Sequence, residues 1–188
     1  MDNPVVQTLR RPRFLTVSMA REMGILLCLS VMFPFMVHLL PVPGDARLGP
    51  RLLPMFYAPL LAALWGRRET AVMLAVVAPW LNRAITGYPP TPGAVVLMIQ
   101  LLVFVGAYRG LMARTGPRWF HAAPAFLAAM AVSGLVGAVD PRLIGGQPAA
   151  AWVISSVTLS LPGIGILVLV NWVALRCYPP GGDGGALA

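Results

Sequence analysis

The 188-residue chain is 58% hydrophobic and only 11% charged, with a formal net charge of +8 and a mean hydropathy of +0.78. A soluble domain normally has about a quarter of its residues charged, because its whole surface faces water. The composition therefore excludes an ordinary soluble domain and predicts an integral membrane protein. All 14 basic residues are arginine, which excludes a P-loop, because that motif needs a lysine to reach the terminal phosphates.

Six apolar segments approach the length of about 20 residues that a membrane-spanning helix needs. We predict an all-α, polytopic membrane protein, a compact bundle of six transmembrane helices over residues 20–176. A cytoplasmic segment, 1–19, precedes it and a flexible tail, 177–188, follows it. The first segment is long for the core of a cleaved signal peptide, so we expect it to be retained. The six predicted helices cover residues 20–41, 51–66, 69–86, 94–113, 121–139 and 151–175.

Arginines flank these segments unevenly, and this asymmetry predicts the orientation. With the N-terminus inside, ten arginines lie on the cytoplasmic side and four outside, which agrees with the positive-inside rule. Both termini are therefore predicted in the cytoplasm, and we expect no nucleic-acid partner for this charge. The outer four are Arg47, Arg51, Arg83 and Arg142. Cys28 and Cys177 lie in or beside apolar runs, and we interpret both as small buried hydrophobic residues without a disulfide or metal site.

The third segment ends in the polar stretch APWLNRAITGYPPTPG, residues 78–93. Asn82 lies about 20 Å along a helix axis from Glu69 at the inner boundary, so it is still inside a hydrocarbon core about 30 Å thick. An amide at that depth is expected to face the bundle interior. Arg83 and Trp80 leave two alternatives open: they line a cavity, or they reach the lipid headgroups beside Tyr88.

Other polar residues occur at a similar depth in the outer half of the bundle. Gln100 lies near the start of the fourth segment, and the sixth begins with Trp152, Ser155 and Ser156. Together with Asn82 they predict an outward-facing binding cavity. We expect the amides and Arg83 to supply hydrogen bonds and charge. Aromatic side chains would form its walls, and Arg51 could neutralise a carboxylate or phosphate.

Small residues recur at four-residue spacing nearer the cytoplasmic side. Such spacing aligns small residues on one helix face, so that another helix can approach closely. The spacing alone leaves two interpretations open, packing within the bundle or docking of a partner membrane protein. The pairs are Ala20 and Gly24, Ala71 and Ala75, and Gly106 and Gly110.

These features together resemble the S component, the substrate-binding subunit, of energy-coupling factor (ECF) transporters. The resemblance covers about residues 20–176 and is carried mainly by LLPMFYAPLLAALWGRRETAVMLAVVAPWLNRAITGYPP and SLPGIGILVLVNWVAL. The first ends in an N-x-x-x-T-G-x-P pattern, here Asn82, Thr86, Gly87 and Pro89. The resemblance implies a six-helix bundle that binds a vitamin or similar micronutrient near its outer face, with the loop from Pro41 to Pro50 helping to cover it.

The resemblance also implies partners. Members of the family dock through small residues of the first helix onto a transmembrane coupling (T) subunit, which two cytosolic ATPases drive. The family pattern Ala-x-x-x-Ala is Ala20-x-x-x-Gly24 here. The expected setting is the bacterial cytoplasmic membrane, where the chain contacts lipid. No cofactor is implied.

Two alternatives come from other classes of protein. The first is a scaffold without a ligand, like the rod-shape-determining membrane protein family D, in which Asn82 and Gln100 would bond each other. The second is an intramembrane enzyme. His121 and Ser133 lie about 18 Å apart along one predicted helix, too far to form a catalytic pair. No cluster of side chains has metal-ligand spacing. We therefore expect neither catalysis nor a metal site.

Overall fold

The computed structural model describes residues 17–38 and 48–177, and the all-α prediction is confirmed for them. The predicted flexible tail from residue 178, the N-terminal segment up to residue 16, and residues 39–47, which include 41–47 of the expected covering loop 41–50, lie outside this part of the chain. The helices are α1 (Val17–His38), α2 (Leu48–Leu52), α3 (Pro54–Trp65), α4 (Arg68–Thr86), α5 (Thr91–Thr115), α6 (Ala122–Val139), the 3₁₀ helix η1 (Pro141–Ile144), α7 (Ala149–Leu159) and α8 (Leu161–Cys177).

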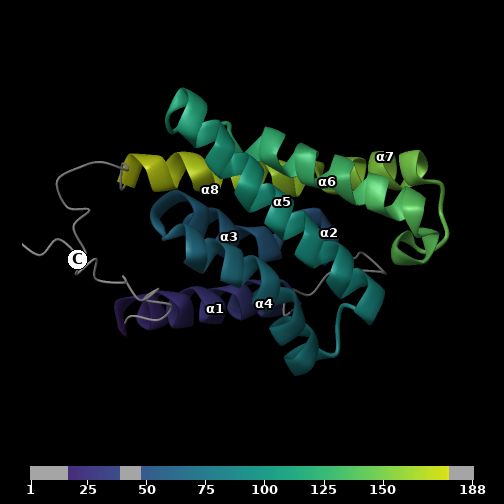
Figure 1. The fold of residues 1–188 in the computed structure, drawn as a ribbon, viewed down its shortest axis with the longest axis horizontal. Coiled ribbons are helices and arrows are strands. Elements are labelled where there is room, and N and C mark those ends of the chain that lie inside the picture. Colours follow the sequence, from purple (N-terminus) through teal and green to yellow (C-terminus); the bar gives the residue numbers. More distant parts are fainter. Residues whose placement is uncertain (1–16, 39–47, 178–188) are drawn as a thin grey trace, which may run out of the picture.

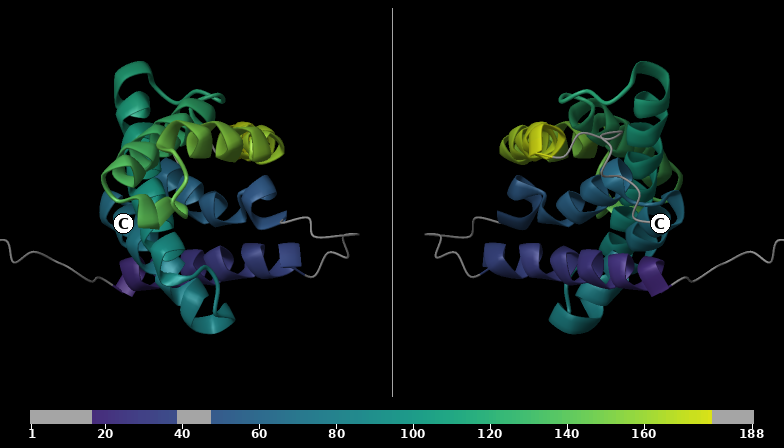
Figure 2. Two further views of the ribbon diagram at one scale, coloured as in Figure 1. Left: turned by 90° about the vertical axis from the view of Figure 1, so that its right-hand side faces the viewer. Right: turned by 90° about the vertical axis from the view of Figure 1, so that its left-hand side faces the viewer.

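The helices form a bundle with α3 at its centre. α3 contacts α1, α4, α5 and α8, whereas α5 and α6 form the most extensive pair. The views at right angles show α1, α3 and α8 stacked on one side, with α5 and α6 beside them (Figures 1 and 2). Nine of the 12 residues of α3 are buried, so this helix forms most of the core.

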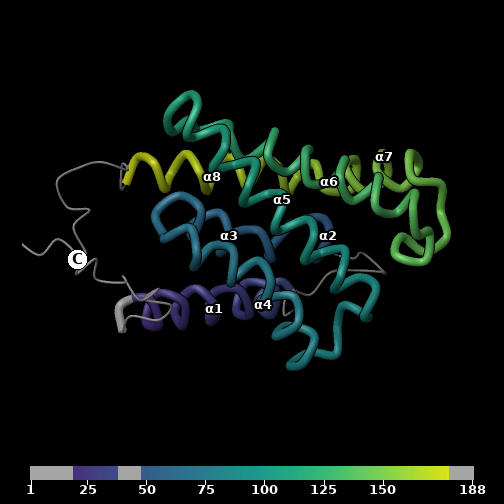
Figure 3. The backbone as a smooth tube through the Cα atoms, in the orientation of Figure 1, coloured from purple at the N-terminus to yellow at the C-terminus, as the bar shows by residue number. Residues whose placement is uncertain are grey.

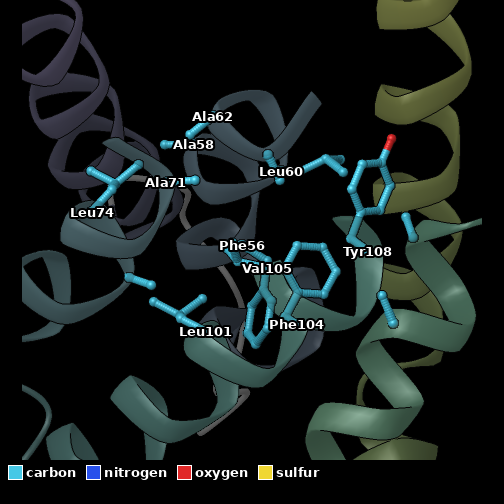
Figure 4. Close-up of a cluster of buried hydrophobic side chains, with 14 of the residues drawn as sticks. Phe56, Ala58, Leu60, Ala62, Ala71, Leu74, Leu101, Phe104, Val105 and Tyr108 are labelled. Atoms are coloured by element: carbon cyan, nitrogen blue, oxygen red, sulfur yellow. The ribbon is translucent and has the colours of Figure 1, made fainter. Parts of the chain in front are cut away.

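Aromatic side chains and alanines fill the space around α3. The ring of Phe56 meets those of Phe104 and Phe126 edge-to-face, with centroids 5.3 and 5.2 Å apart. Ala58, Ala62 and Ala71 belong to the same fully buried cluster (Figure 4). Large rings and small alanines complement each other in volume, which allows interior packing density without voids.

Two of the predicted helices are broken where the sequence predicted continuous spans. Segment 51–66 is divided at Leu53, whose φ of 54° places this bulky residue in the left-handed region. Segment 151–175 is divided at Ser160, and the stretches Pro141–Leu159 and Leu161–Cys177 on either side of it are bent by 58°. The tube in Figure 3 runs from α7 into α8. The apolar pattern continues across both breaks and hides them. The proline that follows each break is compatible with the first turn of a new helix.

Several helices are long and apolar enough to cross a membrane, which indicates a membrane protein. Within the described residues three qualify by themselves, Met19–Val37, Thr91–Thr115 and Ala122–Val139. The bent pair Pro141–Leu159 and Leu161–Cys177 is a fourth if it forms one broken span. The 12 residues of α3 extend only about 18 Å, well short of the hydrocarbon thickness of about 30 Å. The predicted count of six spans therefore goes beyond these three or four.

One end of the bundle gathers arginines from several helices, and we call it the arginine-rich end. Arg109 of α5 donates to the carbonyl of Gly66, at 2.8 Å, and the amide of Arg67 donates to the carboxylate of Glu22 on α1, at 3.3 Å. Asn171 of α8 donates to the carbonyls of Arg118 and Trp119, at 3.0 and 2.8 Å. These bonds join the helix ends that the arginine count predicts to face the cytoplasm.

The prediction that both cysteines are buried was wrong. Cys28 and Cys177 are free thiols exposed on the protein surface. An apolar run in a lipid-facing helix looks the same in sequence as one in a core, because lipid replaces protein as the apolar environment.

The three small-residue pairs differ in burial. Ala71 and Ala75 are fully buried, so packing within the bundle accounts for them, and they are not available to dock a partner. Ala20, Gly24, Gly106 and Gly110 are exposed, and a Cβ built on any of the three glycines meets nothing within 4 Å. The exposed pairs on α1 and α5 therefore keep the docking interpretation open.

Candidate functional site

A cavity of about 420 Å³ lies at the end of the bundle opposite the arginine-rich end. Its wall contains residues of α4, α5, α6 and α7, residues at both helix breaks, and residues of η1. Figure 1 shows the α4–α5 and α6–α7 connections at this end. Ligand pockets usually measure about 300–1,000 Å³ and are mostly apolar with a few polar groups. The volume is therefore sufficient for a small organic molecule.

Asn82 is the most enclosed polar residue on this wall that lacks a complete set of partners. Its side chain is 5% exposed, and its Nδ2 donates to the carbonyl of Tyr88 at 3.0 Å. Its Oδ1 is buried without a partner. The reverse orientation would face two carbonyl oxygens toward each other, so the bond to Tyr88 fixes Oδ1 as the unpaired atom. An unpaired buried acceptor costs about 1–3 kcal/mol.

The connection after α4 holds Asn82 in this orientation. α4 ends at Gly87, whose φ of 74° favours glycine. The hydroxyl of Thr86 is 2.8 Å from the carbonyl of Asn82 and 2.9 Å from that of Tyr88. Arg83 donates from Nη1 to the carbonyl of Pro89 at 2.9 Å. Its guanidinium thus bonds the connection's backbone, and Arg83 does not line the cavity.

Gln100 of α5 is the second amide on the wall. It is 9% exposed, and its Nε2 lies 3.3 Å from the Sδ of Met130 on α6. A thioether is a weak acceptor, so this N–H group can exchange its partner at little cost. Asn82 and Gln100 are not paired with each other, and this overturns the arrangement expected for a ligand-free scaffold.

The two helix breaks meet beside the cavity. The hydroxyl of Ser160, between α7 and α8, donates to the carbonyl of Pro50 in α2 at 2.9 Å. Within the other break, the Tyr57 hydroxyl donates to the carbonyl of Leu52. A Cβ on Gly163 would lie 2.6 Å from the carbonyl oxygen of Arg51. Glycine is therefore needed where α8 approaches α2.

The rest of the wall is apolar. The residues of the described chain that line the cavity include no charged side chain. Aromatic surface comes from Phe56, Phe126, Tyr88 and Trp152. Such a wall favours burial of an apolar body, while Asn82 and Gln100 supply polar contacts at defined places.

The structure brings together five of the nine substrate-site residues predicted from the sequence. They come from α4 and its following connection, from α5 and from α7: Asn82, Tyr88, Gln100, Trp152 and Ser156. The other four do not line the cavity. Trp80 is 37% exposed and directs its indole N–H to Met98 at 3.5 Å. Arg51 and Ser155 are exposed, and Ser155 bonds the carbonyl of Trp152, one turn earlier.

Sequence reasoning missed the apolar wall and the contribution of the helix breaks. The wall includes Pro34 of α1, Met55 and Phe56 of α3, and Val96 and Leu97 of α5. Cavity walls and packed cores use the same apolar residue types, so the sequence carries no signal to separate them. The Leu-Pro sequences at 53–54 and 161–162 mark the breaks but do not show that they meet.

Within residues 17–38 and 48–177, no group of three or more His, Cys, Asp or Glu side chains is placed to hold a metal ion. Of the pair weighed for catalysis, His121 instead lies 3.0 Å from the hydroxyl of Thr115 through Nε2, and Ser133 is buried. Comparison with protein-family models, curated proteins and solved structures gives no match.

Proposed function

We propose that this chain is the substrate-binding S component of an ECF-type importer in the bacterial cytoplasmic membrane. It captures a vitamin or similar micronutrient in the cavity beside Asn82 and Gln100. The observation that carries this proposal is a cavity of about 420 Å³ with two buried amides and apolar walls. Among the described residues, four buried side-chain atoms have no hydrogen-bond partner, and the Oδ1 of Asn82 is the one that belongs to a residue of the cavity wall. A ligand donor would satisfy this acceptor and remove the cost of leaving it unpaired.

The placement of the cavity supports uptake from outside. In the proposed six-span topology the arginine-rich end faces the cytoplasm, as the positive-inside rule favours, and the cavity opens toward the outer side. Broken helices that meet at a site are a feature by which transporters expose polar backbone only where it lines a cavity. The breaks at Leu53 and Ser160 meet this condition.

The proposed coupling subunit would dock on the exposed small residues Ala20 and Gly24 of α1 or Gly106 and Gly110 of α5. All four are exposed, and a Cβ on any of the three glycines meets nothing within 4 Å, so another helix can approach closely there. This chain has no lysine and therefore no P-loop with which to hydrolyse ATP. The energy for uptake would come from two cytosolic ATPases.

The proposal is tested first by the small molecules that the protein carries. The full chain, purified in detergent, is denatured and its bound small molecules are identified by mass spectrometry. The identified molecule is then supplied to cells that express the chain with its coupling module. The proposal predicts one recurring molecule and ATP-dependent accumulation of it.

Two results would contradict the proposal. A protein that is reproducibly empty, and whose melting temperature does not respond to a panel of vitamins, would not be a capture subunit. Loss of cell shape on deletion, with uptake unchanged, would favour the scaffold class instead.

A further inference from the structure

We infer that the cavity selects an electrically neutral ligand that donates an N–H or O–H group to the Oδ1 of Asn82. This inference rests on the proposed function and specifies the chemistry of its substrate. It departs from one alternative that the sequence left open, an anionic ligand whose carboxylate or phosphate Arg51 would neutralise, with Arg83 supplying further charge.

The polarity of the Asn82 amide is set by the protein before a ligand arrives. The bond from Nδ2 to the carbonyl of Tyr88 uses one of the two N–H donors of the amide and fixes which end is the nitrogen. The hydroxyl of Thr86 lies 2.9 Å from the same carbonyl. The buried, unpaired Oδ1 is an acceptor. A ligand donor satisfies it, whereas a ligand carbonyl or carboxylate in the same place meets another oxygen.

Among the described residues, neither of the two arginines expected at the site lines the cavity. Arg83 gives its Nη1 to the carbonyl of Pro89, and Arg51 is exposed and does not line the wall. A carboxylate in this cavity would lose water without meeting a cation from the described wall, and such desolvation is costly. A neutral molecule avoids that cost.

The apolar and aromatic residues of the cavity wall favour a ligand whose body is also apolar. Phe56, Phe126 and Trp152 line the space, so a flat ring system fits the chemistry of the wall. Gln100, whose Nε2 is held only by the sulfur of Met130, can donate to an acceptor on the same ligand. The inferred class is a neutral heteroaromatic or lactam-like compound with at least one N–H or O–H donor.

The test uses probe sets that differ only in the donor and the charge. One set is indole, 1-methylindole and indole-2-carboxylate, and the other is nicotinamide, N,N-dimethylnicotinamide and nicotinate. Affinities for the full chain in lipid nanodiscs are measured by titration calorimetry, with native mass spectrometry as a second readout. Three proteins are compared: the natural chain, Asn82→Ala, and Ser155→Ala. The last removes an exposed hydroxyl that bonds only its own helix and lies off the cavity wall.

The donor form of at least one set is expected to bind the natural chain about tenfold to a hundredfold more tightly than its methylated form. This ratio falls to about twofold or less in Asn82→Ala and is retained in Ser155→Ala. Tighter binding of the carboxylates, or an unchanged ratio in Asn82→Ala, would overturn the inference but leave capture of a ligand intact. Failure of every probe and of a vitamin panel to bind would overturn both the inference and the proposed function.

Discussion

The hydroxyl of Ser160 donates to the carbonyl of Pro50 at 2.9 Å, and this bond joins the two helix breaks across 110 positions of sequence. Ser160 is 4% exposed. The bond thus stabilises the contact of α2 with the α7–α8 junction, beside the cavity. The shape of the wall depends on two chain discontinuities that support each other.

Replacing this hydroxyl should loosen the junction. Ser160→Ala leaves the carbonyl of Pro50 without this donor in a partly buried place, and we expect a loss of about 1–3 kcal/mol in unfolding free energy. Thermal unfolding in detergent measures the change. Ser155→Ala is the matched control, because Ser155 is exposed and bonds only its own helix. An equal effect of both substitutions would show that the bond across the junction has no special role.

Adding one methyl group at Gly163 should separate the same two elements. The Cβ of Gly163→Ala would lie 2.6 Å from the carbonyl oxygen of Arg51 and 2.8 Å from the Cγ of Leu53. Such overpacking typically costs about 1–3 kcal/mol. Gly165→Ala, where a Cβ meets nothing within 4 Å, should be neutral or slightly stabilising in the helix. The apparent melting temperatures of the two variants are compared. Equal values would contradict the close approach of α8 to the backbone of Arg51.

Arg83 should be dispensable for ligand contact. Its guanidinium bonds the carbonyl of Pro89 and does not line the cavity. We expect Arg83→Gln to change the affinity for the co-purified ligand by less than about threefold, because a contact to the backbone can be replaced by water or by the glutamine amide. Asn82→Ala should weaken it about tenfold or more. A greater loss of ligand affinity in Arg83→Gln than in Asn82→Ala would contradict this and show that the Arg83 guanidinium contributes to ligand binding.

Acidification should weaken the arginine-rich end. Burial, with a further contribution from the Arg118 charge, lowers the pKa of His121 from its ordinary value of 6.5. The unfolded chain therefore takes up a proton before the folded chain does, so stability is retained above pH 6.5 and falls as the pH drops below it. Melting temperatures between pH 8 and pH 5 check this. His121→Gln should reduce the fall of the melting temperature between pH 6.5 and pH 5. An unchanged dependence on pH in this variant would contradict the assignment of the effect to His121.

Much of the fold follows from the sequence, because apolar runs bounded by arginine, glycine and proline fix where helices can lie. The predicted segments 69–86 and 121–139 differ from α4 and α6 by one residue at a single end. The breaks at Leu53 and Ser160 were not predicted, because the hydropathy of the sequence does not change across them. A break is set by contacts between elements far apart in sequence, which a local pattern does not contain.

Site residues with short side chains were easier to predict than those with long side chains, because a short side chain can reach fewer partners. The short amides of Asn82 and Gln100 have no favourable partner in lipid, so their inward position followed from depth alone. The long side chains of Arg83 and Trp80 can reach several partners. Arg83 bonds the carbonyl of Pro89 and Trp80 bonds the sulfur of Met98, and neither Arg83 nor Trp80 lines the cavity. Ser155 and Ser156 are adjacent in sequence, but Ser156 lines the cavity whereas Ser155 is exposed. The difference arises because successive residues of a helix point in different directions.

These two serines supply the most direct test that the cavity is a ligand site. Ser156 lines the cavity, whereas Ser155 is exposed and lies off the wall. Native mass spectrometry of the full chain measures the bound fraction of the co-purified molecule in Ser156→Phe and in Ser155→Phe, with circular dichroism to confirm that both fold. The account predicts that the molecule is lost from Ser156→Phe and retained at the natural level in Ser155→Phe. Equal occupancy in the two folded variants would contradict it.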